Sequence, residues 1–202
     1  MYLVKVKIED SKIQGKGYFA DQFIPVGTLV YCYSSKDKKY TKGQFEKLPQ
    51  DQKKHLVEFA VEDEFGNWVE TETGPYTNHS CDPNIISIYI QGYYLDIAIK
   101  DIDIGDEITI DYGFFYSSEK WEMNCNCGSE NCRKKIGFGI SIGSDIEERY
   151  YEKASLAISS IKDIKQPIFN IKDEDIVIVA NLIRNLKIVS LGKFVKFSLI
   201  NG

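Results

Sequence analysis

Three cysteines stand close together in the second half of the 202-residue chain, in the pattern Cys125-x-Cys127-x4-Cys132. Gly128 and Ser129 lie inside this run and allow a tight bend, which suits thiolates that converge on one zinc ion. Structural zinc is nearly always four-coordinate, so a fourth ligand has to come from elsewhere in the chain. The candidates are Cys81, Cys32, His79 and His55.

Two alternatives to such a zinc site stay open for the cysteine run. In one, the thiols are reduced and partly exposed, and in the other they belong to a small zinc ribbon that binds nucleic acid. A ribbon normally needs two cysteine pairs, and this run supplies only one. Disulfides are disfavoured because the five cysteines belong to a chain that is expected to stay inside the cell.

A glycine turn near the N-terminus, Gly15-Lys16-Gly17-Tyr18-Phe19-Ala20, indicates by itself only that the backbone bends. It is not a dinucleotide fingerprint, because Ala20 replaces the third glycine and no βαβ alternation follows. A Rossmann-type methyltransferase is therefore disfavoured. Farther along lie a polar loop, Asn78-His79-Ser80-Cys81-Asp82-Pro83-Asn84, and the segment from Gly105 to Gly113, which contains Asp111 and Tyr112.

In this order, and within about sixty residues, the polar loop, the Gly105 to Gly113 segment and the cysteine run resemble the SET-domain protein lysine methyltransferases. The resemblance covers residues 1 to about 139 and is strongest from Asn78 to Arg133. It implies an α+β, β-rich SET-domain (β-clip-like) fold of several small sheets with a pseudo-knot. It also implies that S-adenosylmethionine is the methyl donor and that a protein lysine is the acceptor.

The resemblance divides the chain into a SET domain at 1–116 with an insert at about 34–75, a post-SET zinc segment at 117–139, and a C-terminal helical extension at 140–202. Post-SET segments share their zinc with the cysteine of the Asn-His-Ser-Cys motif. The implied zinc ligands are therefore Cys81, Cys125, Cys127 and Cys132. Cys32 then remains as a buried small apolar residue.

The resemblance also implies the residues that bind the cofactor: Lys16, Gly17, Tyr18, Asn78, His79, Tyr112, Trp121 and Phe138. The glycine turn lets the backbone approach S-adenosylmethionine, with Lys16 or Tyr18 against its carboxylate or ring. Asn78 and His79 hold the adenine and amino-acid ends of the cofactor. Trp121 or Phe138 stacks on the adenine ring, although either ring is equally well explained as a core side chain.

Methyl transfer from a sulfonium to an amine is an in-line displacement, which needs a neutral nucleophile about 3 Å from the methyl carbon. A free lysine has a pKa of about 10.4, and a poorly hydrated aromatic channel disfavours its charged form. By resemblance, Tyr112 is the catalytic tyrosine beside the transferring methyl, and Tyr33 lines the lysine channel. Weaker candidates for that channel are Phe114, Tyr76 and Tyr116.

Asp111 and Glu107 are not expected to form an acid-base pair. The simpler interpretation is a solvated turn carboxylate and a group that fixes the local backbone. The chain departs from many family members at Ile110, which stands where they carry Phe or Tyr and where the number of added methyl groups is set. Isoleucine cannot hydrogen-bond a water there, which favours more than one methylation.

Short strands have to position these residues. Apolar alternation and turn residues predict strands at 3–8, 18–20, 28–33, 85–89, 93–99 and 108–110, with hairpins near the N-terminus. A short helical insert is predicted from Phe45 to Phe59, interrupted by Pro49, with a turn at Phe65–Trp68.

From Ser144 the pattern becomes helical. Ser144 and Glu147 form a capping-box signature, and apolar residues continue at helical spacing to Ile161, which predicts a helix of about five turns. A second helix is predicted to begin at Asp173–Asp175 and to end before Gly192, and a strand is predicted at Phe194–Ile200. We expect the 140–202 region to pack onto the body of the protein.

The composition restricts the partner. Lys and Arg number 25 against 30 Asp and Glu, and the net charge of -5 argues against a general grip on nucleic acid. A basic protein or peptide, such as a histone tail, fits better. The N-terminus alternates charged with apolar residues, so neither a signal peptide nor a membrane span is predicted, and the expected location is intracellular, cytoplasmic or nuclear.

The alternative to an enzyme is a catalytically silent SET module that acts as a zinc-stapled protein-binding domain. The presence of Asn78, His79 and Tyr112 together favours the enzyme.

Overall fold

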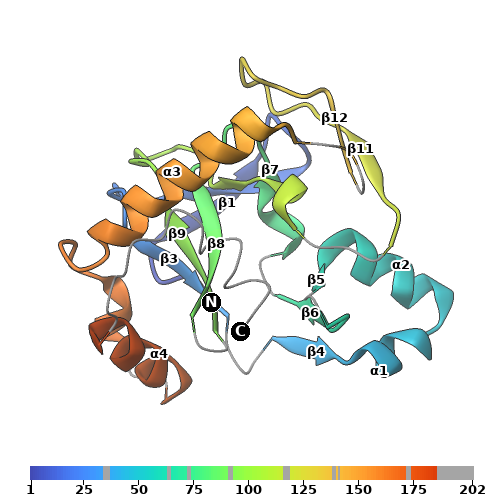
Figure 1. The fold of residues 1–202 in the computed structure, drawn as a ribbon, viewed down its shortest axis with the longest axis horizontal. Helices are drawn as coiled ribbons and strands as arrows, with labels where there is room; N and C mark the ends of the chain where they lie inside the picture. Colours follow the sequence, from blue (N-terminus) through green and yellow to red (C-terminus); the bar gives the residue numbers. More distant parts are fainter. Residues whose placement is uncertain are drawn as a thin grey trace.

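The computed structural model describes residues 1–33, 37–62, 65–71, 74–90, 93–115, 119–137, 140, 142–171 and 174–185. Over these residues the protein consists of several two- and three-stranded sheets with helices around them (Figure 1). This agrees with the predicted α+β, β-rich class. No helix within the described ranges is both long enough and apolar enough to span a membrane.

The first hairpin pairs β1 (Val6–Asp10) with β2 (Lys16–Ala20) in antiparallel register. Gly15, in the turn, has a φ of 53°, a conformation that glycine adopts without strain. The edge of β2 also contacts a later segment, because the Ile108 N–H donates to the Tyr18 carbonyl over 2.7 Å and Phe19 bridges Glu107. The predicted N-terminal hairpin is confirmed, and it lies against the Gly105 to Gly113 segment.

The central sheet has the order β3 (Leu29–Cys32), β9 (Tyr93–Ala98) and β8 (Ile85–Ile90), all antiparallel. Alternate residues point to opposite faces, as the strand period requires. One face, which includes Leu95 and Ile97, packs against residues of the C-terminal helices. The other face, which includes Val30 and Ala98, forms a second core with the N-terminal hairpin. These three strands confirm the predicted ones.

A short parallel pair joins the two most informative sequence segments. β7 (Asn78–His79) pairs with β10 (Thr109–Ile110), with Asn78 opposite Thr109. Asn84 reinforces the pair, since its side chain donates to the Glu107 carbonyl and accepts from the Thr109 N–H, both over 2.8 Å. The 3-10 helix η2 (Tyr112–Phe114) follows directly. The pseudo-knot itself stays a prediction.

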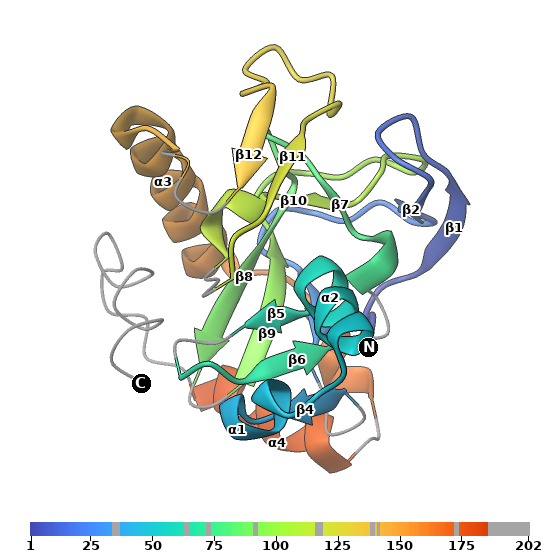
Figure 2. The same cartoon turned by 90° about the vertical axis from the view of Figure 1, so that its right-hand side faces the viewer.

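The insert forms a separate small unit. Its sheet has the order β4 (Lys38–Tyr40), β6 (Trp68–Glu70) and β5 (Val61–Glu62), and it is covered by α1 (Lys42–Glu46) and α2 (Gln50–Phe59) (Figure 2). Phe45 and Trp68 stack in its core with ring centroids 4.8 Å apart. The helical insert is confirmed, whereas its three strands were not predicted. A 3-10 turn, η1 (Gly74–Tyr76), leads from the insert to β7.

The cysteine run lies between two further strands, β11 (Glu122–Asn124) and β12 (Lys135–Gly137), which pair antiparallel. The hairpin lies at the top right in Figure 1, beside the N-terminal end of α3. The sequence did not predict these strands.

The C-terminal region contains α3 (Ser144–Ser160), η3 (Pro167–Asn170) and α4 (Glu174–Asn185). Both predicted helices are confirmed, but the predicted capping box is wrong. Gly143, with a φ of 93°, takes the cap position in place of Ser144, and no side chain caps the first turn. The predicted strand at Phe194–Ile200 lies outside the described residues.

One buried side chain joins this region to the central sheet. Gln166 is 1% exposed, and its Oε1 accepts from the Leu29 N–H over 2.9 Å. Its Nε2 donates to the carbonyls of Gly27 (2.8 Å) and Ile161 (2.9 Å). The amide therefore hydrogen-bonds to both sides of the junction. The described part of the 140–202 region packs onto the body, as expected.

Candidate functional site

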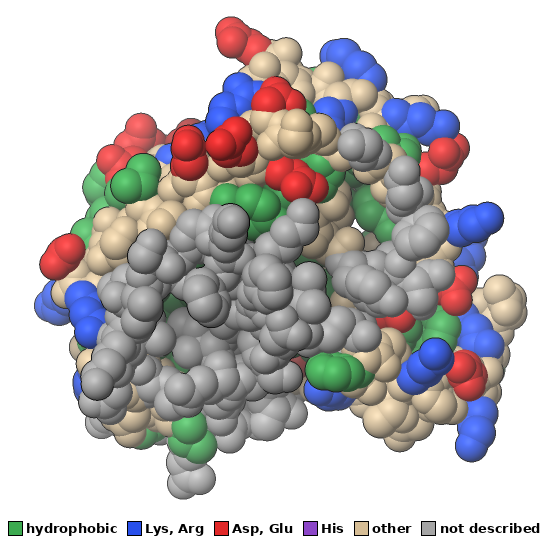
Figure 3. Space-filling model, in the orientation of Figure 1, with side chains coloured by type: hydrophobic (Ala, Val, Ile, Leu, Met, Phe, Trp, Pro, Cys, Tyr) green, Lys and Arg blue, Asp and Glu red, His purple; other side chains and the backbone are tan. Residues whose placement is uncertain are grey.

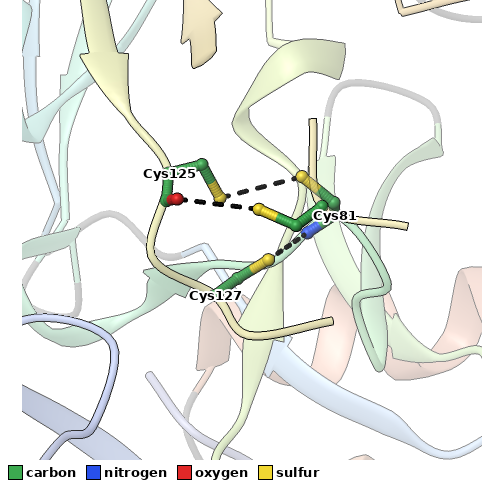
Figure 4. A group of neighbouring side chains, drawn as sticks. Cys81, Cys125 and Cys127 are labelled. Atoms are coloured by element: carbon green, nitrogen blue, oxygen red, sulfur yellow. Dashed lines mark hydrogen bonds between the residues drawn. The ribbon is translucent and has the colours of Figure 1, made fainter. Parts of the chain in front are cut away.

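Four cysteine sulfurs gather where the β11–β12 hairpin meets the end of β7. The Sγ atoms of Cys81, Cys125, Cys127 and Cys132 all lie within 4.8 Å of one another. Figure 4 shows the contacts: Cys81 Sγ lies 3.7 Å from Cys125 Sγ, and the Cys81 N–H donates to Cys127 Sγ over 3.5 Å. The thiol of Cys132 donates to the Cys125 carbonyl over 3.6 Å.

This donor set fits a zinc ion. Zinc–sulfur bonds of about 2.3 Å in a tetrahedron place the sulfur atoms about 3.8 Å apart. The 3.7 Å between Cys81 Sγ and Cys125 Sγ is close to that spacing. Two of the other candidate ligands lie elsewhere: Cys32 is in the central core, and His55 bonds to Glu70 through its Nε2, 2.9 Å from Oε1. The third, His79, lies beside the cluster, with its Nε2 3.3 Å from Cys81 Sγ.

The thiols differ in their acidity. Burial raises the pKa of the Cys125 thiol and that of the Cys81 thiol, the latter against hydrogen bonds from Arg133. At Cys127, burial is outweighed by hydrogen bonds from the Cys81 N–H and from Ser129, which lower its pKa to about 6. A coordinated metal ion deprotonates thiol ligands outright, so all four sulfurs are suited to bind as thiolates.

His79 lies between the cysteine cluster and Tyr112. Its Nδ1 accepts from the Tyr112 N–H over 3.2 Å, which assigns the ring hydrogen to Nε2, 3.3 Å from Cys81 Sγ. Burial, helped by the charge of Arg133, lowers the pKa of His79 to about 4. The imidazole is therefore neutral near pH 7 and connects the backbone of Tyr112 to the sulfur of Cys81.

Asn78 fixes the turn of the N-terminal hairpin. Its Nδ2 lies 3.2 Å from the Gln14 carbonyl, 3.0 Å from the Lys16 carbonyl and 2.6 Å from Glu107 Oε1. Gly17 is packed against this group, because a Cβ atom there would lie 2.3 Å from Glu107 Oε1. Only a residue without a side chain leaves this arrangement undisturbed.

The expectation for Asp111 and Glu107 is wrong in one part: neither is a solvated turn carboxylate. The other part, a carboxylate that fixes the local backbone, agrees with the structure. Asp111 is 1% exposed, and its Oδ1 accepts from the Gly113 N–H over 2.8 Å, which caps η2. Glu107 is half-buried and accepts from Asn78 and from the Ser11 hydroxyl, the latter over 2.9 Å. Both carboxylates fix the backbone around the site.

The hydroxyl of Tyr112 donates to the Thr77 carbonyl over 2.7 Å. Burial, with a smaller contribution from the charge of Glu107, raises the pKa of Tyr112 to about 12, so the phenol stays protonated at neutral pH. A pocket opens beside this ring, between the N-terminal hairpin turn and the β11 strand. Its lining residues are Ile13, Gln14, Asn78, His79, Tyr112, Met123, Asn124, Cys125 and Asn126.

Residues 15–113 of this chain match the family model described as the SET domain. This stretch of the chain belongs to the SET-domain family. The cysteine cluster that follows the SET domain is consistent with a post-SET zinc site.

Two relatives of this SET protein illustrate the likeness. Human "Histone-lysine N-methyltransferase 2D" is 29% identical over 136 residues, which are 64% of this chain and 2% of that protein. "Probable histone-lysine N-methyltransferase set-23" of Caenorhabditis briggsae is 28% identical over 150 residues, 68% of this chain and 62% of that protein. The chain therefore spans less than two thirds of the length of either relative.

A solved structure titled "crystal structure of KRYPTONITE in complex with mCHG DNA and SAH" superposes with a TM-score of 0.50. The two chains are 20% identical, and the match covers 65% of this chain and 29% of that one. At this identity the likeness establishes the fold alone. The predicted SET fold of several small sheets is confirmed.

The other predicted cofactor residues of the SET domain lie as follows. Lys16 extends along the hairpin surface, with its Nζ 3.2 Å from Asp10 Oδ1. Tyr18 is buried in the core, its ring 4.6 Å from that of Tyr2. Trp121 stands just before β11 and is partly buried, whereas Phe138 lies outside the described residues.

The tyrosine predicted to line the lysine channel, Tyr33, belongs to a cluster of aromatic rings. Its ring centroid lies 5.1 Å from that of Tyr31 and 5.7 Å from that of Tyr94. Burial raises the pKa of Tyr33 well above its ordinary value. Tyr76 packs edge-on against Tyr18, 5.9 Å away, and Tyr116 lies outside the described residues.

Sequence reasoning missed several residues of this SET site. The pocket-lining amides of Gln14, Asn124 and Asn126 carry no signal, because polar loop residues occur throughout the chain. Arg133, next to the last cysteine, was also missed. Its Nη2 lies 2.5 Å from Asp111 Oδ1, and it is mostly buried, which nothing in the spacing indicated.

Proposed function

We propose that the chain is a protein-lysine N-methyltransferase, which transfers a methyl group from S-adenosylmethionine to a lysine side chain of a protein. The observation that carries this proposal is the pocket in which the Tyr112 ring, Asn78 and His79 come together. The names of the relatives support the same activity.

The pocket has the chemistry that the cofactor requires. Asn78, Asn124 and Gln14 bring amide donors and acceptors to its wall, which suits the carboxylate, ammonium and adenine groups of S-adenosylmethionine. The close packing at Gly17 keeps the β1–β2 turn near that wall. We propose that these residues, with His79 and Tyr112, hold the cofactor, and that Lys16, Tyr18, Trp121 and Phe138 are further candidates.

When bound, S-adenosylmethionine supplies a methyl group on a positively charged sulfur. We propose that Tyr112 is the catalytic residue that orients this methyl. Its hydroxyl hydrogen is engaged by the Thr77 carbonyl, so the oxygen lone pairs are free to face a partial positive charge. The neutral phenol keeps this geometry at neutral pH because its pKa is about 12.

The acceptor lysine enters as an ammonium group and loses a proton to solvent before it reacts. Its nitrogen lone pair forms the new N–C bond while the C–S bond breaks, and that electron pair stays on the departing sulfur. An aromatic channel lowers the cost of the neutral amine. We propose Tyr33, with its neighbours Tyr31 and Tyr94, as part of that channel.

We propose that zinc bound by Cys81, Cys125, Cys127 and Cys132 holds the β11–β12 hairpin over the cofactor pocket. The pocket lining supports this, because it includes Cys125, its direct neighbours Asn124 and Asn126, and Met123. The division into a SET domain at 1–116, a post-SET segment at 117–139 and an extension at 140–202 belongs to the same proposal.

A basic, flexible protein segment is the proposed substrate, with a histone tail as the first candidate. Figure 3 shows acidic side chains gathered over α3 on the face displayed, and the whole chain carries a net charge of -5. Such a surface attracts a cationic peptide. Methylation of histone tails would take place inside the cell, on chromatin.

The deciding experiment incubates the purified chain with radiolabelled S-adenosylmethionine and core histones, and repeats the reaction with Tyr112→Phe. We expect labelled histone with wild type and a loss of about 100-fold or more with Tyr112→Phe, while the affinity for the cofactor changes little. Equal labelling by both proteins would remove Tyr112 from the mechanism. Cofactor binding without labelling of any basic protein would favour the silent, protein-binding SET module.

A further inference from the structure

Arg133 makes three contacts that reach beyond its own hairpin. Its backbone N–H donates to Cys81 Sγ over 3.4 Å, and its Nε donates to the same sulfur over 3.3 Å. Its Nη2 donates to Asp111 Oδ1 over 2.5 Å. The side chain is 11% exposed and that of Asp111 is 1% exposed, so this is a buried ion pair and not a screened surface contact.

The three contacts link parts of the chain that are far apart in sequence. Cys81 follows β7, Asp111 follows β10, and Arg133 follows the last cysteine of the run. The next residue, Lys134, has a φ of 65°, a left-handed conformation that costs free energy for a residue with a side chain. The hairpin therefore adopts a strained backbone immediately beside the point where Arg133 reaches the other two segments.

Asp111 transmits this contact to the tyrosine. The same Oδ1 that receives Arg133 also accepts the Gly113 N–H and so caps η2, the turn that begins with Tyr112. His79 makes a second connection between the same places, from Cys81 Sγ to the Tyr112 N–H. Tyr112 is thus joined to the sulfur of Cys81 by two routes, one through Arg133 and Asp111 and one through His79, whose Nδ1 also lies 3.6 Å from Asp111 Oδ1.

We propose that Arg133 is a positioning residue, which couples the four-cysteine site to the orientation of Tyr112 through Asp111. This inference rests on the proposed function for its effect on turnover, but not for its effect on the metal. Four thiolates around a divalent zinc ion leave a net negative charge, and the guanidinium lies against one of those sulfurs. Its fixed fork of donors can hold the sulfur and the carboxylate at once, which a lysine ammonium cannot do with the same geometry.

Coupling between two sites is reciprocal in free energy. A change at Asp111 should therefore loosen the metal, although Asp111 is not one of the four cysteines. A change at Arg133 should disturb the Tyr112 turn, although Arg133 does not line the pocket beside the Tyr112 ring. If Arg133 served only to neutralise charge at the cysteines, a change at Asp111 would not loosen the metal and a change at Arg133 would not disturb the Tyr112 turn.

The experiment measures zinc release from the purified, zinc-loaded chain after addition of a colorimetric chelator, together with kcat and KM for methyl transfer. The variants are Arg133→Gln, Arg133→Lys, Asp111→Asn and the double variant Arg133→Gln/Asp111→Asn. Arg149→Gln is the matched control, because its pair with Asp145 is exposed on α3. Circular dichroism verifies that each variant is folded.

We expect Arg133→Gln and Asp111→Asn each to release zinc about tenfold faster than wild type, as outer-shell changes at metal sites do. The double variant should be no faster than the more affected single variant, and kcat should fall with little change in KM for the peptide. Arg149→Gln should match wild type. Arg133→Lys keeps the positive charge, so its zinc release should stay closer to the wild-type rate than that of Arg133→Gln. Its kcat should remain below the wild-type value.

Three results would overturn the coupling. They are zinc release from Asp111→Asn at the wild-type rate, additive effects in the double variant, and full restoration of both readouts by Arg133→Lys. If Arg133→Gln does not fold, the zinc release of Asp111→Asn and the kcat of Arg133→Lys decide the question. If wild type shows no methyl transfer but the zinc results hold, the coupling stands and the proposed function fails.

Discussion

The ring of Tyr150 lies parallel to the ring of Phe114, with centroids 3.6 Å apart and planes inclined by 7°. Phe114 ends the turn that begins with Tyr112, and Tyr150 projects from α3. Tyr151 adds an edge contact to the same ring at 6.1 Å. The C-terminal region therefore packs directly on the turn that carries the proposed catalytic tyrosine.

Replacement of Tyr150 by alanine should lower both stability and turnover. Loss of a large buried ring costs about 3–5 kcal/mol in the free energy of unfolding, and Phe114 would lose its stacking partner. Tyr150→Phe keeps the stacked ring and should cost less than about 1.5 kcal/mol. Urea unfolding and methyl-transfer kinetics measure the two effects.

The control for this prediction lies on the same helix. Leu156 is 69% exposed, so Leu156→Ala should change the free energy of unfolding by less than about 0.5 kcal/mol. If Leu156→Ala and Tyr150→Ala proved equally destabilising, the ring contact would not account for the loss, because alanine is the better helix former at both positions.

Replacement of Asp96 by asparagine should stabilise the protein at neutral pH. Asp96 is 7% exposed, and burial raises its pKa from 3.8 to about 6, against the hydrogen bond from Ser87 and the charge of the amino terminus. The aromatic groups whose titration it affects, Tyr2, Tyr33 and Tyr150, stay neutral because burial raises their own pKa. Of these four side chains, Asp96 is therefore the one that titrates in the acidic range.

The sign follows from proton linkage. Below about pH 4 Asp96 is protonated in both states and costs nothing, whereas between about pH 4 and pH 6 only the unfolded state loses the proton. Wild-type stability should thus fall over this range by about 3 kcal/mol relative to Asp96→Asn, and the difference should persist at higher pH. Unfolding measured from pH 3.5 to pH 8 tests this, and parallel curves for the two proteins would contradict it.

Replacement of Gly17 by alanine should weaken cofactor binding. The new Cβ would meet Glu107 Oε1 at 2.3 Å, and Glu107 is held by Asn78 and Ser11, so the hairpin turn beside the pocket has to shift. We expect a loss of about tenfold in affinity for S-adenosylmethionine, measured by calorimetry.

Gly43 provides the matched control. It lies in α1, and a Cβ there meets nothing within 4 Å. Gly43→Ala should stabilise the protein by about 0.5–1 kcal/mol through helix propensity and leave cofactor affinity unchanged. Equal loss of affinity in both variants would show that Gly17 has no special place at the pocket.

Replacement of Cys81 by serine should release zinc. The sulfur of Cys81 lies 3.7 Å from that of Cys125, and without it the proposed site has three thiolates. Unfolding free energy should fall by about 4 kcal/mol or more, and cofactor affinity should fall with it because the β11 strand lines the pocket. Elemental analysis and thermal unfolding measure the change. Cys32 lies in the central core, so the Cys32→Ala variant should contain as much zinc as wild type.

Much of the central fold was predictable because its strands alternate. Ile86 and Ile88 face one core while Ile85 faces the other, and such alternation is visible in a sequence. The insert strands were not predictable for the opposite reason. Lys38 to Tyr40 is a three-residue strand without apolar alternation, and it exists because β6 provides a partner far along the chain.

The site shows the same division. The local spacing of the three clustered cysteines predicts a metal site. That Cys81 lies beside them depends on the parallel pairing of β7 with β10. Asp111 and Arg133 form their ion pair in the interior, whereas charged residues are ordinarily expected at the surface. Local sequence patterns therefore predict which residues can bind a metal. The contacts between distant segments that bring those residues together become visible only in the tertiary structure.

The amide of Gln166 has a consequence for the order in which the protein can fold during synthesis. Leu29 and Gly27 are made early, yet their hydrogen-bond partner lies 137 and 139 residues later in the chain. Until that residue leaves the ribosome, the edge of β3 has an unpaired N–H beside an apolar core. The body of the protein is thus completed only after Gln166 has been translated, so a chain that ended before this residue would leave the Leu29 N–H without this partner.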